Sequence, residues 1–88
     1  MATYNLGMLL AEQDDVEGAK AAFGQAIASG HAEVAPTAAT KLGALLAEQG
    51  DVEGAKAAFG QAIASGDAEA APTAANNLEV LTRKHERR

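Results

Sequence analysis

The side chains that could do chemistry are few and scattered along the chain. There are two histidines, His31 and His85, and no cysteine. Neither histidine has a second metal-ligating residue at helical spacing, so we expect His31 to be a solvated connector residue and predict no metal site. Because there is no thiol, a disulfide framework, a cysteine nucleophile and a thiolate metal site are all excluded.

Among the carboxylates, Asp14-Asp15 is the pair most suggestive of a cation site. A nearly identical stretch later in the chain has Gly50-Asp51 instead, so only the second aspartate is shared. An Asp that precedes a helix caps the free N–H groups of the first turn, and we assign that role to both shared aspartates, Asp15 and Asp51.

The sequence also lacks the features of a catalytic site. Glu12 falls at an expected exposed helix end, not in an apolar pocket that would raise its pKa. The sequence also contains no phosphate-binding loop, nucleophile elbow or zinc-protease motif. We therefore predict that the chain is not an enzyme and binds no cofactor.

The charge is unevenly spread. Residues 1–82 carry −8 and residues 83–88 carry +3, which gives a net charge of −5. An acidic body argues against a nucleic-acid surface, because phosphates favour basic stripes. The basic end could touch nucleic acid or anionic lipid, but we interpret it as favourable charge at a helix C-terminus.

The sequence shows no membrane-spanning or targeting segment. No apolar run approaches the length of about 20 residues that is needed to span a bilayer, and the first residues do not resemble a signal peptide. We expect a cytoplasmic protein, or a piece of one, without nucleic-acid or membrane partners.

The elements that position these residues repeat at a fixed interval. Residues 15–30 return letter for letter at 51–66, and the windows 4–39 and 40–75 differ at six of 36 positions. Such a period is the signature of stacked repeats. Apolar residues three and four apart predict helices over 3–13, 16–29, 37–49, 51–65 and 73–86. The last helix keeps one apolar face and turns polar elsewhere, as a terminal cap does.

These patterns predict one all-α domain over residues 1–88. Its architecture is an α-solenoid of antiparallel helical hairpins with five helices. Repeat 1 covers about 1–35, repeat 2 about 36–71, and a capping helix about 72–88. Pro36 is expected in the first turn of the third helix. Gly7 and Gly43 are expected to let two helices approach closely, whereas Gly24 and Gly60 have no explanation beyond lowered stability.

Residues on both hairpins resemble the tetratricopeptide repeat family. Asn5-Leu6-Gly7, then Gly50-Asp51, Ala55, Phe59, Ala62 and Ile63 are similar to its N-L-G…G-D…A…(F/Y)…A-(I/L) pattern. The chain departs from that pattern in its 36-residue period, where the family's usual period is 34, and in Thr3, Ala39 and Ala75, where a large aromatic is expected. The proline that closes the second helix is replaced by His31 and Asp67, and the connector is also similar to Sel1-like repeats.

The resemblance implies a right-handed superhelix whose first helices line a concave, peptide-binding face. Some members clamp a C-terminal carboxylate there with Lys and Asn, but Glu12 and Glu48 occupy this face, so we do not expect that clamp. Carried over by position, the face contains Tyr4, Met8, Ala11, Glu12, Thr37, Thr40, Ala44, Ala47, Glu48, Thr73, Asn76, Val80, Arg83 and Lys84.

Two hypotheses about function stay open at this point. The first is a protein-interaction scaffold that binds a peptide or partner helix in the groove. The second is a self-associating unit, because near-identical hairpins can dock or swap between chains. The uniformity of the repeats also suggests an excised, consensus or engineered sequence without a natural ligand. The stripe formed by Tyr4 and Met8 could anchor a partner, or it could pack under an upstream helix of a longer parent.

Overall fold

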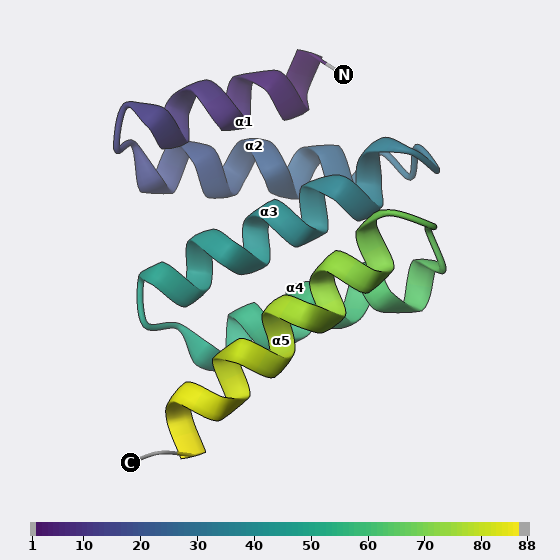
Figure 1. The fold of residues 1–88 in the computed structure, drawn as a ribbon. Coiled ribbons are helices and arrows are strands. Elements are labelled where there is room, and N and C mark those ends of the chain that lie inside the picture. Colours follow the sequence, from purple (N-terminus) through teal and green to yellow (C-terminus); the bar gives the residue numbers. More distant parts are fainter. Residues whose placement is uncertain (1, 87–88) are drawn as a thin grey trace.

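The computed structural model describes the backbone of residues 2–86 and the side chains of residues 3–84. Within that range it contains five helices and no strand. The helices are α1 (Ala2–Glu12), α2 (Val16–Ala28), α3 (Val34–Glu48), α4 (Val52–Ser65) and α5 (Ala70–Glu86). Each helix packs against the next one in the sequence and runs back along it (Figure 1). The predicted fold class, an all-α stack of helical hairpins that ends in a single helix, is confirmed.

The helices form two rows. The front row consists of α1, α3 and α5, where α3 contacts α5 and, over a shorter length, α1. The back row consists of α2, which packs against α1 and α3, and α4, which packs against α3 and α5. The two back-row helices do not contact each other. The Cα trace measures 38 × 29 × 16 Å. Because the body is only about two helices thick, the core is confined to the seam between the rows.

That core is built on Phe23 of α2 and Phe59 of α4, the largest fully buried side chains. Each ring lies against a glycine of the front row. A Cβ on Gly7 would lie 2.7 Å from Cε1 of Phe23, and one on Gly43 would lie 2.6 Å from Cδ1 of Phe59. Both distances are shorter than a carbon–carbon contact allows, so the rings can sit there only because these residues are glycine. The predicted close approach is confirmed.

Alanines fill the space around both rings. Ala19 and Ala26 flank Phe23, and Ala55 and Ala62 flank Phe59, and all four are almost fully buried. Ile27 and Leu42 pack against both clusters, so the core continues from one repeat to the next.

The back-row helices begin with the predicted caps. Oδ1 of Asp15 accepts a hydrogen bond from the Gly18 amide, and Oδ1 of Asp51 accepts one from the Gly54 amide, each at 3.0 Å. A Cβ on Gly18 or Gly54 would lie 2.6 or 2.5 Å from a carboxylate oxygen of its cap. These two glycines therefore give the capping carboxylates room to sit directly over the first turn.

The helices α3 and α5 begin three residues earlier than predicted, so the predicted starts near Thr37 and Thr73 were wrong. The Ala35 amide donates to the His31 carbonyl at 2.9 Å, which closes a helical turn before Pro36. Pro36 is then the third residue of α3 and still lies in the first turn, where its missing N–H costs no hydrogen bond. At the start of α5, Oδ2 of Asp67 accepts a hydrogen bond from the Ala70 amide at 2.8 Å and so caps the helix. Helix α3 has no such side-chain cap.

The glycines give a matched test of packing. Gly60 faces open space, with no neighbouring side chain within 4 Å of a Cβ built on it. We expect Gly60→Ala to raise the free energy of unfolding by about 1 kcal/mol, because alanine favours the helix. Gly43→Ala gains the same propensity but presses a methyl group into Phe59, an overpacking that costs about 1–3 kcal/mol. Urea denaturation followed by circular dichroism measures both values, and equal effects would contradict the contact between Phe59 and Gly43.

A second matched pair tests the turns between hairpin helices. Asp14 has φ of 64° and Gly50, at the same position of the next repeat, has φ of 83°. Asp14→Gly should stabilise the domain and Gly50→Asp should destabilise it, each by about 0.5–1 kcal/mol, because the left-handed conformation is costly for residues with a Cβ. Thermal denaturation of both variants checks this. A loss of stability in Asp14→Gly would show that the aspartate side chain matters more than its backbone conformation.

Candidate functional site

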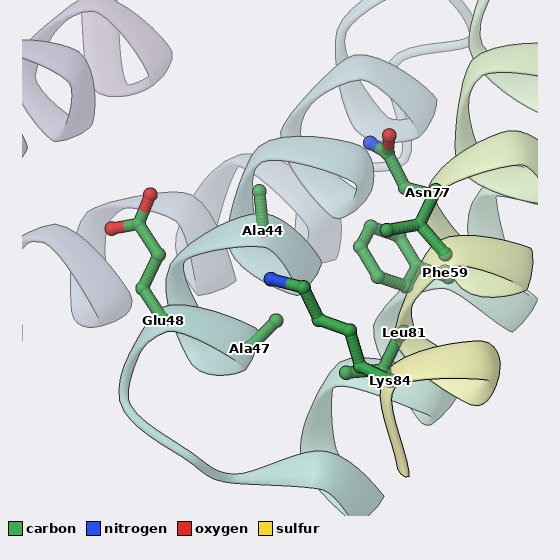
Figure 2. Close-up of a pocket in the computed structure, with 8 residues that line it drawn as sticks. Ala44, Ala47, Glu48, Phe59, Asn77, Leu81 and Lys84 are labelled. Atoms are coloured by element: carbon green, nitrogen blue, oxygen red, sulfur yellow. The ribbon is translucent and has the colours of Figure 1, made fainter. Parts of the chain in front are cut away.

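A hollow of about 310 Å³ lies between α3 and α5, at their C-terminal halves (Figure 2). We call it the main groove. Its floor is apolar, because the edges of the buried residues Phe59 and Leu81 reach it. The lining consists of Ala44, Ala47, Glu48, Phe59, Asn77, Val80, Leu81 and Lys84.

Small side chains create this groove. Ala44 and Ala47 on α3 are too short to reach across to α5 (Figure 2). On the other side Val80 is 47% exposed, which is unusual for a valine within a helix-packing seam. In α1, the position of Ala44 is occupied by Met8, a longer side chain that packs against the Phe23 cluster. An apolar surface that is left open in this way can accept an apolar side chain from a partner.

The rim of the main groove is polar and asymmetric. Figure 2 shows the ammonium group of Lys84 reaching over the groove towards α3, between Ala44 and Ala47. The carboxylate of Glu48 points away from Lys84, and the amide of Asn77 lies beyond Phe59. Lys84 and Asn77 can donate hydrogen bonds, and Glu48 can only accept them when ionised. The groove therefore has an apolar floor, one positive side and one negative end.

A smaller hollow of about 210 Å³ lies between the N-terminal halves of the same two helices. Its lining consists of Thr37, Thr40, Lys41, Glu69, Ala70 and Thr73. The threonine hydroxyls donate to carbonyls one turn earlier, at 3.3 Å for Thr37, 3.0 Å for Thr40 and 2.9 Å for Thr73. Thr40 is buried. These hydroxyls keep only acceptor capacity for a ligand, so Lys41 is the donor that this hollow offers.

The predicted groove residues fall into several places. Ala44, Ala47, Glu48, Val80 and Lys84 share the main groove, whereas Thr37, Thr40 and Thr73 share the smaller hollow. Tyr4 lines a third hollow, between α1 and α3, with Glu33, Val34 and Thr37.

The other predicted residues are not brought into either α3–α5 hollow. Met8 and Ala11 are half-buried against the Phe23 cluster, and Glu12 is exposed at the end of α1. Asn76 is exposed, and Arg83 pairs with Glu79 at 3.0 Å on the surface of α5. Of the basic end, residues 87–88 and the side chains of residues 85–86 lie outside the described residues.

Sequence reasoning missed Asn77, Leu81 and Phe59 of the main groove and Lys41, Glu69 and Ala70 of the smaller hollow. Asn77 and Leu81 could have been found, because Asn77, Leu81 and Lys84 lie four and three residues apart and thus share a helical face. Phe59 could not, because it belongs to the back row, and only the structure shows that its side chain lines a groove between two front-row helices.

In the described part of the chain, no helix is long and apolar enough to cross a membrane. Residues 3–84 also contain no group of three or more His, Asp or Glu side chains placed to hold a metal ion.

Glu48 can be tested as a rim residue without a structural role. It is exposed and is the last residue of α3, where a negative charge opposes the helix dipole. We expect Glu48→Lys to leave the free energy of unfolding unchanged or to raise it by about 0.3–1 kcal/mol. Glu12→Lys, at the same position of α1, is the matched control and should behave alike. A marked loss of stability in Glu48→Lys alone would show that its carboxylate holds the fold and is not available to a partner.

Comparison with known proteins gives one positive finding. Residues 1–29 and 37–65 each match the family model described as tetratricopeptide repeat. The two matches cover 58 of the 88 residues. The first contains the hairpin of α1 and α2, and the second contains α4 and most of α3. No characterised protein and no solved structure matches the chain.

Proposed function

This chain belongs to the tetratricopeptide repeat family, and from that premise we propose that its main groove, between α3 and α5, binds a peptide segment or a helix of a partner protein. Repeats of this family generally mediate contacts between proteins and are not catalytic. The observation that carries the proposal is the open hollow between two front-row helices, in which the half-exposed Val80 and the short side chains of Ala44 and Ala47 lie over the buried residues Phe59 and Leu81.

The floor indicates what a partner would bring. An apolar side chain of the partner would cover carbon surface that is otherwise in contact with water, a gain of about 25 cal/mol per Å² buried. The hollow holds about 310 Å³, which is near the lower end of the size of ligand pockets. We therefore expect a single apolar side chain as the anchor, with the partner backbone lying along the groove.

The rim indicates how a partner would be oriented. Lys84 reaches over the groove, so an acidic side chain next to the apolar anchor would be favoured there. Glu48 at the end of α3 would favour a basic or neutral residue on its own side. Since both rim charges are exposed, each contributes modestly to affinity, and they act mainly by selecting the direction of binding.

Charge reversal at Lys84 tests this orientation. Peptides selected on the wild-type protein from a displayed random library serve as probes. Lys84→Glu should weaken their binding about 5- to 10-fold, since removing one favourable charge and adding a repulsive one costs about 1 kcal/mol. Lys56→Glu, an exposed lysine of α4 with the same change of charge, should leave the affinity unchanged. Fluorescence anisotropy with the synthetic peptides measures each affinity.

Filling the groove tests its use directly. Ala47→Arg places a long side chain over the floor, and the exposed residue Ala57 of α4 provides the matched control, Ala57→Arg. The selected peptides should lose at least about 10-fold in affinity for Ala47→Arg, equivalent to about 1.4 kcal/mol. They should bind Ala57→Arg as they bind the wild type, and circular dichroism confirms that both variants are folded. Peptides that bind both folded variants equally well would overturn the groove as the binding site.

A further inference from the structure

The outer face of α1 carries two exposed leucines at positions where the leucines of the other front-row helices are covered. Leu6 is 49% exposed and Leu9 is 50% exposed. At the same positions of α3, Leu42 and Leu45 are half-buried against the cluster formed by α2 and the beginning of α3. In α5, Leu78 is half-buried and Leu81 is only 6% exposed. The same residue type at the same position is therefore covered in two front-row helices and open in one.

The reason lies in the order of the stack. The back-row helix α2 precedes α3 and packs on it, and α4 precedes α5 and packs on it (Figure 1). The leucines of α3 and α5 pack into clusters that contain residues of these preceding helices. Among the described residues no helix precedes α1, which lies at the edge of the stack in Figure 1. The Leu6 and Leu9 side chains thus form an apolar surface that no other element of the described structure covers. We call this surface the α1 face.

The opposite end of the stack does not offer a surface that would cover it. The last back-row helix, α4, is already covered by α5. At the position where Gly7 and Gly43 admit a phenylalanine ring, α5 has Glu79, whose exposed carboxylate pairs with Arg83 at 3.0 Å and would be buried by a back-row helix docked there. A head-to-tail chain of copies would need α1 to dock against a back-row helix, whereas this end of the stack presents the front-row helix α5.

We propose that the α1 face binds the α1 face of a second copy of this chain, related to the first by a two-fold axis. Such an isologous contact closes on itself and forms a dimer. Charge favours it, because Glu12, the last residue of α1, is the only charged residue of that helix, whereas residues 1–82 together carry −8. Two acidic bodies therefore meet with the least repulsion at this neutral face. The proposal does not depend on the main groove, which lies between α3 and α5.

The small size of the face sets the strength of the dimer. Each copy contributes two half-exposed leucines from one helix of 11 residues. An interface of this kind falls below the about 1,200 Å² of standard protein interfaces and belongs with weak or transient contacts. We expect an equilibrium between monomer and dimer with a dissociation constant in the micromolar range or weaker.

Sedimentation velocity over a series of protein concentrations measures this equilibrium. The wild type should move from the mass of one chain, 8.9 kDa, towards twice that mass as the concentration rises. Leu9→Gln should weaken the dimer about 10-fold or more, because each copy then presents a polar side chain where an apolar one was buried in the interface. Ile63→Gln, which removes a 36% exposed apolar side chain of α4, should leave the equilibrium unchanged. A wild type that stays monomeric throughout, or a dimer that is sensitive to Ile63 and not to Leu9, overturns the proposal.

A cysteine cross-link tests the symmetry and does not depend on the stability of Leu9→Gln. The chain has no cysteine, so an introduced one is the only thiol. Under mild oxidation Leu9→Cys should form disulfide-linked dimers rapidly, because a two-fold axis through the α1 face brings residue 9 near its own copy. Ala57→Cys, an exposed position of α4, should react only at the rate of random collision. Equal rates for the two variants contradict a contact through α1.

Discussion

The structure depends on one steric relation, in which a phenylalanine of each back-row helix rests on a glycine of the preceding front-row helix. Phe23 on Gly7 and Phe59 on Gly43 bring the two helices of a hairpin together, and a single methyl group at either glycine would collide with the ring. A helical glycine costs about 1 kcal/mol, and the burial of a whole phenylalanine side chain offsets that cost. The alanines around each ring follow from the same short distance between the helices.

For the proposed function, this close approach also determines where a partner would bind. A core of alanines and two rings is only one side chain deep, so the floor of the main groove is the edge of the core itself, at Phe59 and Leu81. Affinity for a partner in the proposed site and stability of the domain would therefore depend on the same residues. Changes to the floor would alter both, whereas changes to the rim at Glu48 or Lys84 act on exposed groups and should alter binding alone.

The sequence was sufficient for the helices, their order and the caps, because the 36-residue repeat shows each pattern twice. It was not sufficient for the first residues of α3 and α5, since a proline fits the third helical position as well as the first. The empty space around Gly24 and Gly60 could not be predicted either, because a sequence does not show which neighbours a residue lacks. The groove was predicted only as a face of helices. Its division into separate hollows depends on how far neighbouring side chains reach, and a residue pattern does not contain that distance.

The differences between the repeats explain why the hollows lie where they do. Helices α2 and α4 are identical along their whole shared length, as is expected when both must fill the same space against a front-row glycine. In the front row, Tyr4 and Met8 of α1 are replaced by Thr40 and Ala44 in α3. Tyr4 packs on Phe23 with 5.9 Å between ring centroids, whereas the smaller residues of α3 leave the two hollows towards α5 open. Of the six positions at which the two repeats differ, these two thus open the space that a partner would fill, and the second repeat, not the first, carries the groove.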